Sequence, residues 1–104
     1  MNIFYALGEP TRLSIVELLA MQGRLTATQI ASKFSVSAAA ISQHLKVLRE
    51  AKLVIMEKNA QQRIYQIDKK TIHEVENWSK ELTKTLDKRF SIMERLLDDI
   101  KKKG

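Results

Sequence analysis

The 104-residue chain contains no cysteine, one proline and only three glycines. Without cysteine, neither a disulfide framework nor a thiolate metal site can form, and the composition fits a reducing compartment such as the cytoplasm. So few chain breakers favour long helices joined by short loops. No apolar run approaches the ~18 residues of a membrane span, and the N-terminal residues lack the pattern of a signal peptide. We therefore expect a cytoplasmic protein with no membrane partner.

Charge of one sign is in excess, because 18 Lys and Arg face 12 Asp and Glu, for a net charge of +6. A small basic domain is attracted to polyanions, although such an excess can also serve solubility alone. The apolar content of 44% is enough for one modest core. We expect one domain over residues 1–104.

Two helices are predicted in the first quarter of the chain. A short one covers residues 2–8, and a second begins near Pro10, a residue that the first helical turn tolerates. Gly23 marks the end of this second helix. Its apolar residues at helical spacing are Leu13, Val16, Leu18 and Leu19.

A second pair of short helices is predicted after Gly23. Thr26 and Gln29 have the spacing of a capping box, and Ser37 is a favourable N-cap for the helix that follows. That helix carries one apolar stripe, formed by Ile41, Leu45 and Leu48. Two helices joined by a tight turn, the second of them amphipathic, are typical of a helix-turn-helix.

After Ala51 the pattern becomes that of β-structure. The segments LVIMEK and RIYQID are rich in strand-forming residues and are separated by NAQQ, which predicts a hairpin. Asn59 can take a left-handed turn conformation, but the turn lacks the expected glycine, so the residues leave its geometry open. The predicted fold is therefore mainly α: a winged helix-turn-helix with a two-stranded β-wing.

A long final helix is predicted over residues 71–103, with Thr71 and Glu74 as a second capping box. It would be roughly 50 Å long, against a radius of gyration near ~13 Å for a domain of this size. Its apolar residues recur three and four apart, which favours dimerisation with a second copy. The alternative is a shorter, kinked helix that folds back onto its own core. The interface residues expected on this helix are Leu82, Leu86, Phe90, Met93, Leu96 and Leu97.

The helix-turn-helix and the wing together predict DNA binding, with the second helix in the major groove. Off its apolar stripe lie Ala38, Ser42, Gln43 and Lys46. Glutamine can bond an adenine edge, serine a base or a phosphate, and lysine a phosphate. Lys58 and Arg63 flank the hairpin turn, where a cation can reach the minor groove or a phosphate. For each of these residues the alternative is an ordinary solvated polar surface.

The segments ALGEPTRLSIVELL, SAAAISQHLKVLREAKLV and RIYQID resemble the ArsR/SmtB family of winged-helix transcriptional repressors over about residues 4–68. The resemblance implies a homodimer on double-stranded DNA, with the first and last helices at the interface, which adds Phe4. It also implies a recognition helix over residues 37–51, with Ser37 and His44 at DNA-facing positions. Two places depart from the family: Ala38 and Ala39 stand where many members have glutamine and often proline, and Lys52 replaces the usual glycine.

The resemblance raises the question of metal sensing. Family members place metal ligands as cysteines in the first helix of the helix-turn-helix or as Asp, His and Glu on the last helix. Here the only histidines are His44 and His73, whereas a transition metal needs three or four ligands. We expect no metal and no cofactor.

No group of residues predicts catalysis either. Ser42 and His44, for example, lie two apart on a helix and do not face each other. We expect a DNA-binding repressor rather than an enzyme. The alternative is a protein-interaction module that docks through its long last helix.

Overall fold

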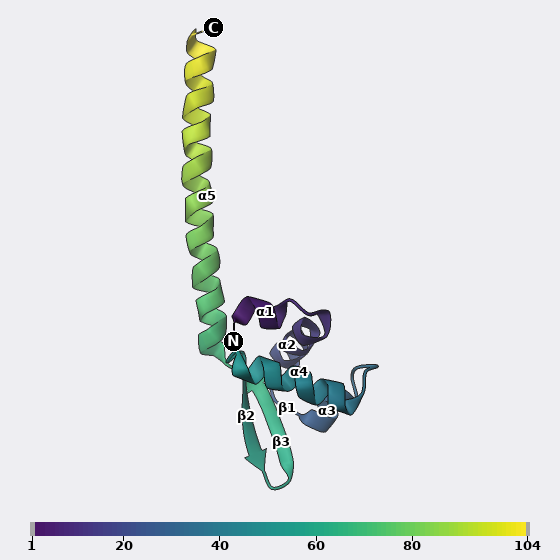
Figure 1. Ribbon diagram of the computed structural model, residues 1–104. Coiled ribbons are helices and arrows are strands. Elements are labelled where there is room, and N and C mark those ends of the chain that lie inside the picture. Colours follow the sequence, from purple (N-terminus) through teal and green to yellow (C-terminus); the bar gives the residue numbers. More distant parts are fainter. Residues whose placement is uncertain (1, 104) are drawn as a thin grey trace. The chain divides into compact units, whose positions relative to one another are not determined.

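The computed structural model describes residues 2–103 (Figure 1). Its elements in chain order are α1 (Ile3–Leu7), α2 (Pro10–Gln22), β1 (Leu25–Thr26), α3 (Ala27–Ala31), α4 (Ala38–Glu50), β2 (Val54–Asn59), β3 (Gln62–Ile67) and α5 (Lys69–Lys103). The mainly helical winged-helix prediction is confirmed. The chain divides into two compact units, one ending at Thr71 and the other beginning at Ile72.

The second helix, α2, begins at Pro10 and ends before Gly23, as predicted. The Glu9 carboxylate accepts a hydrogen bond of 2.9 Å from the backbone N–H of Arg12, and Pro10 occupies the first turn of α2. Gly23 ends α2 with φ +86°, a conformation that favours glycine. Leu13, one of the residues whose spacing predicted this helix, is 43% exposed, and the buried side of α2 instead includes Ile15.

Both helices of the helix-turn-helix are capped as predicted. Thr26 and Gln29 form a reciprocal capping box at the start of α3. The Ser37 hydroxyl accepts from the N–H of Ala40, 3.1 Å away, at the start of α4.

The end of α4 is a Schellman motif built around Lys52. The N–H of Leu53 donates to the carbonyl of Leu48 at 3.0 Å, and that of Lys52 donates to Arg49 at 2.9 Å. Lys52 has φ +61°, and Leu48 and Leu53 are both completely buried. This left-handed position is the reason why a glycine suits this site, and Lys52 occupies it with a Cβ atom.

The wing is a tight hairpin within a sheet of order β1-β3-β2. Asn59 pairs with Gln62, which leaves a two-residue loop. The left-handed residue of this loop is Ala60, at φ +58°, rather than Asn59. A positive φ at the first loop residue is the pattern of a type II′ turn. The third strand, β1, was not predicted; it pairs Leu25 with Tyr65.

The start of α5 is attached to the end of α4. The hydroxyl of Thr71 donates to the carbonyl of Lys52 at 2.6 Å, and the N–H of Asp68 donates to the carbonyl of Leu53 at 2.9 Å. The predicted capping box of Thr71 and Glu74 was therefore wrong. The helix begins two residues earlier, where the Asp68 carboxylate accepts from the N–H of Lys70.

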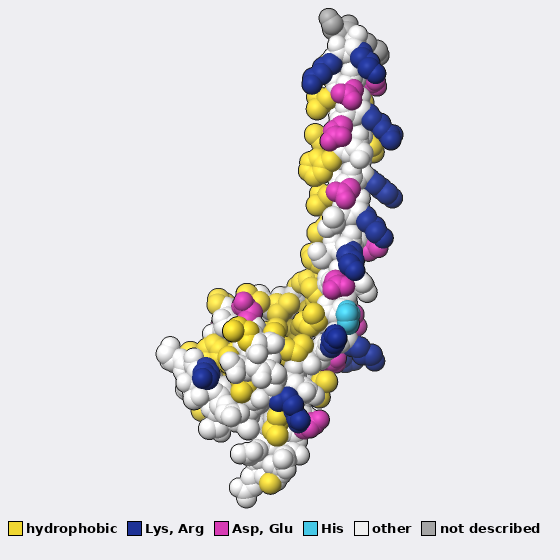
Figure 2. All heavy atoms as spheres, turned by 180° about the vertical axis from the view of Figure 1, so that it is seen from behind, with side chains coloured by type: hydrophobic (Ala, Val, Ile, Leu, Met, Phe, Trp, Pro, Cys, Tyr) yellow, Lys and Arg dark blue, Asp and Glu magenta, His cyan; other side chains and the backbone are white. Residues whose placement is uncertain are grey.

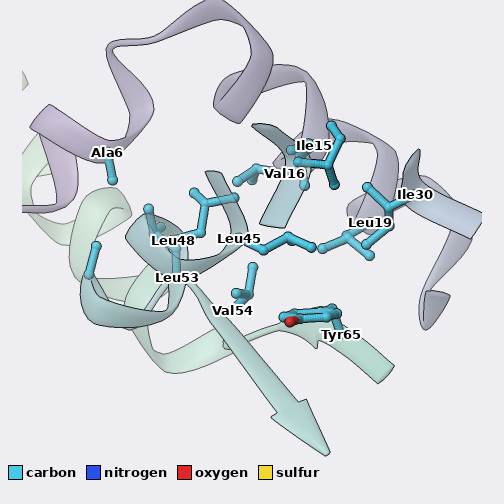
Figure 3. Close-up of a cluster of buried hydrophobic side chains, with 12 residues drawn as sticks. Ala6, Ile15, Val16, Leu19, Ile30, Leu45, Leu48, Leu53, Val54 and Tyr65 are labelled. Atoms are coloured by element: carbon cyan, nitrogen blue, oxygen red, sulfur yellow. The ribbon is translucent and has the colours of Figure 1, made fainter. Parts of the chain in front are cut away.

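The core lies among α2, α4 and the sheet. Ile41, Leu45 and Leu48, the predicted stripe of α4, are each at most 1% exposed. Figure 3 shows Leu45 directed toward Leu19 of α2, above Val54 and Tyr65 of the sheet. Burying this stripe leaves the opposite side of α4 at the surface.

Candidate nucleic-acid interface

A groove of about 450 Å³ separates α4 from β3. Its lining comes from α3, α4 and β3: Ala27, Ser42, Gln43, Lys46, Arg49, Glu50, Arg63 and Tyr65. Ser42, Gln43 and Lys46 are exposed because they lie on the side of α4 opposite its buried stripe. The structure thus brings four of the predicted DNA-binding residues, Arg63 included, to one concave surface.

The pleat of β3 explains why a wing cation reaches this groove. Arg63 and Tyr65 are two residues apart and share one face of the strand. Tyr65 is 4% exposed, so that face is directed at the helices, and Arg63 at its outer end borders the groove.

Lys58 lies directly opposite Arg63 in the hairpin register. Cross-strand partners share a face, so the two cations are neighbours, and both residues are exposed. Like charges in this arrangement repel each other and favour a bound anion. The neighbouring acid Glu57 is engaged elsewhere, in an ion pair of 2.8 Å with Arg24.

The leading turn of α4 offers backbone groups rather than side chains. Ser37, Ala38 and Ala39 are exposed, whereas Ala40 is half-buried. The Ser37 hydroxyl oxygen already accepts from Ala40, and the two alanines ahead carry only methyl groups. What remains here is the partial positive charge of a helix N-terminus, which suits a phosphate.

His44 is the one predicted residue of α4 that faces elsewhere. Its Nδ1 lies 3.3 Å from Nη1 of Arg12 and 3.6 Å from Oε2 of Glu9, both on or next to α2. Its side chain is 20% exposed and does not line the groove. A DNA contact by His44 stays a prediction, and its contacts instead link α4 to α2.

Arg49 lines the groove but was not predicted. It follows Lys46 by three residues and Ser42 by seven, so all three share a helix face. Extending the polar side of α4 by one more turn would have found it.

Positive charge is concentrated in the unit that holds the groove. Residues 1–71 carry 10 Lys and Arg against five Asp and Glu, a net charge of +5, whereas residues 72–104 carry a net charge of +1. Among the described residues, no three His, Asp or Glu side chains gather as metal ligands would. No helix in residues 2–103 is apolar enough over sufficient length to cross a membrane.

The second unit presents an apolar surface of its own. In Figure 2 the apolar side chains run along one side of α5, and Lys and Arg gather on the opposite side. The predicted interface residues of α5 are all 45–57% exposed: Leu82, Leu86, Phe90, Met93, Leu96 and Leu97. Phe4, on α1, is 45% exposed.

Known proteins are similar to this chain in sequence and in fold. A family model described as a helix-turn-helix domain matches residues 7–57. The chain is 34% identical to the transcriptional repressor SdpR of Bacillus subtilis over 77 residues, which are 74% of this chain and 84% of that protein. A solved ArsR family transcriptional regulator matches with a TM-score of 0.75 at 26% identity, over 82% of this chain and 87% of its own. A possible transcriptional regulator for arsenical resistance matches with a TM-score of 0.72 at 34% identity, over 79% and 84%.

Proposed function

Because this chain belongs to the ArsR/SmtB family of winged-helix transcriptional regulators, we propose that it is a homodimeric repressor that binds an operator and occludes it. The observation that carries the proposal is the groove, in which the polar side of α4 and a cation of β3 face the same space. Repression of this kind is steric: a dimer over a promoter blocks the polymerase. It requires no catalytic residue, metal or cofactor, and it places the protein in the cytoplasm beside the chromosome.

Each groove residue has a role that its chemistry supports. Gln43 bonds the edge of an adenine in the major groove, and Ser42 bonds a base or a phosphate. Lys46 neutralises a phosphate, as does the N-terminus of α4 behind Ser37. On the wing, Arg63 and its neighbour Lys58 contact the minor groove or the backbone.

The bare leading turn of α4 sets how selective the protein is. Ala38 offers a methyl group, which can contact only the methyl of a thymine. Phosphate contacts and DNA shape therefore supply much of the affinity, and base selectivity is modest. Replacing Ala38 with glutamine adds a side chain that reads bases and should change the preferred sequence. An unchanged preference would show that this turn does not lie in the major groove.

The apolar side of α5 supports the dimer. Half-exposed leucine, phenylalanine and methionine side chains each gain on the order of 1 kcal/mol when the remaining surface is buried. In a two-fold dimer the same residues are buried on both copies, so each of them contributes this free energy twice. Phe4 joins the interface in this proposal.

The direct test is selection of bound duplexes from a random pool, followed by affinity measurements at several salt concentrations. We expect a site with two half-sites ~34 Å apart and an affinity that falls steeply with salt. Arg63→Ala removes one cation from each copy of the dimer and should lower the salt slope by about two, whereas Gln43→Ala should reduce the preference for the selected site. Lys88→Ala, an exposed cation of α5 outside the groove, is the matched control. No preference over random duplex at moderate salt would refute the proposal.

A second candidate is favoured by the apolar side of α5: a protein-interaction module that docks through this helix. In that case Gln43→Ala and Arg63→Ala leave function intact, whereas Leu86→Glu abolishes it. In a repressor both classes of change weaken operator binding, and Leu86→Glu does so by producing monomers. Sedimentation velocity distinguishes the two, with Lys88→Glu on the polar side of the helix as control.

A further inference from the structure

Arg12 is a nearly buried cation outside the groove, only 9% exposed. Its Nε donates to the carbonyl of Ala6 at 2.7 Å, and its Nη2 donates to the carbonyl of Tyr5 at 3.4 Å. The guanidinium carbon also lies 5.5 Å from the centre of the Tyr5 ring. A buried charge needs such partners, and these two carbonyls fix Arg12 at the end of α1.

The third nitrogen of the guanidinium, Nη1, faces α4, which is the recognition helix in the proposed function. Nη1 of Arg12 lies 3.3 Å from Nδ1 of His44, the inward-facing residue of α4. The same Nδ1 lies 3.6 Å from Oε2 of Glu9, whose carboxylate caps α2. The backbone N–H of Arg12, and to a smaller extent His44, hold the pKa of Glu9 below its ordinary value, so the carboxylate is charged at neutral pH.

Protonation of His44 decides which of its two neighbours it can bond. A guanidinium only donates, so Arg12 bonds Nδ1 only while that atom is unprotonated and the ring proton is on Nε2. Once Nδ1 carries a proton it can no longer accept from Arg12, and it faces a second positive charge. Its remaining partner is the Glu9 carboxylate, which accepts.

Among residues 2–103, the charged side chains that bond or pair with this nitrogen are those of Arg12 and Glu9. The Tyr5 ring of α1 contacts the guanidinium of Arg12. Within one turn of His44, the positions three and four residues away on α4 are Ala40, Ile41, Val47 and Leu48, none of which titrates.

We propose that Arg12 is a positioning residue for DNA recognition: it sets α4 against α2 through the neutral ring of His44, and acidification releases that bond in favour of Glu9. The inference rests on the proposed function, because it treats α4 as the recognition helix. Histidine is the side chain that commonly gains or loses a proton under mild conditions, so pH is the variable to test. The predicted consequence is a loss of site preference rather than of general DNA attraction, since the added positive charge does not weaken attraction to phosphate.

The test compares the affinity for a duplex selected by the wild-type protein with that for a scrambled duplex, from about pH 8 to about pH 5.5. We expect the wild-type preference to fall about tenfold, as the loss of one hydrogen bond to a charged group implies. His44→Asn places an amide oxygen where Nδ1 lies and should keep the high-pH preference at every pH. His44→Leu should show the reduced preference throughout. His73→Asn, which changes the second histidine, an exposed one, should leave the preference with the same pH dependence as in the wild type.

Two results would overturn the inference: His44→Asn with the same pH dependence as the wild type, or His44→Leu with full preference at pH 8. A measurement that needs no DNA tests the bond itself. The ring ¹⁵N shifts of His44 at pH 8 should report a proton on Nε2 and none on Nδ1, and Arg12→Met should change them. If those shifts agree but no duplex is preferred at any pH, the proposed function fails while the Arg12–His44 bond stands. If the ¹⁵N shifts of His44 are the same in Arg12→Met as in the wild type, the hydrogen bond between Arg12 and His44 is refuted.

Discussion

Replacing Lys52 with glycine should stabilise the protein. Lys52 has φ +61° at the end of α4, where a residue with a Cβ atom bears roughly 1–2 kcal/mol of strain. Glycine removes that strain but loses about 0.5–1 kcal/mol more backbone entropy on folding. The difference is an increase of about 0–1.5 kcal/mol, centred near about 0.75 kcal/mol, in the free energy of unfolding. Urea denaturation at one fixed protein concentration measures it, because the stability of a dimer depends on concentration.

Lys52→Ala is the control that separates backbone strain from charge. It removes the same ammonium group but keeps a Cβ atom in the left-handed conformation, so we expect no gain. Both variants retain the carbonyl that accepts the Thr71 hydroxyl. If the alanine variant gained as much as the glycine variant, repulsion among cations would be the source and the strain argument would be wrong. If neither gained, the strain at the left-handed position would be no larger than the backbone entropy that glycine loses on folding.

Three further changes test other parts of the structure. Leu45→Ala should lower the free energy of unfolding by about 2–5 kcal/mol, because truncating this buried side chain leaves a cavity in the core. Urea midpoints measure the loss, and a loss under ~1 kcal/mol would mean that the surrounding side chains move in to fill the space. Arg24→Ala should change stability by less than ~1 kcal/mol, since both partners of its ion pair are more than half exposed; a larger loss in the same assay would contradict this. The lowered pKa of Glu9 means that its contribution to stability is fully present above about 4.5 and is lost as the pH falls through the lowered value, so wild type and Glu9→Gln should converge in acid. A constant difference between their urea midpoints from about pH 6 to about pH 3 would refute that linkage.

Capping residues made most of the helices predictable. Ser37 and the pair of Thr26 and Gln29 mark their helix starts in the sequence because the bonds they form are local. Thr71 misled the prediction for the same reason: its spacing to Glu74 fits a local bond, but its hydroxyl bonds the distant carbonyl of Lys52. The strand β1 was missed because two residues show no alternation.

In the candidate site, too, the features set by local spacing were predictable, and those set by distant residues were not. The buried stripe of α4 predicts which side chains face outward, so the exposed positions of Ser42, Gln43 and Lys46 follow from spacing alone. The orientation of His44 depends on Arg12, 32 residues earlier, and spacing within one helix does not contain that information. In addition, nothing in the sequence distinguishes an arginine that is buried in the fold from one at the surface.

Thr26 belongs to two elements at once. It is the last residue of β1, paired with Ile64, and also the N-cap of α3. No spacer residue therefore separates the sheet from the helix-turn-helix. Insertions at this junction would break either the strand pairing or the cap, whereas the hairpin loop of Ala60 and Gln61 is a place where the length of the wing can change without disturbing the junction.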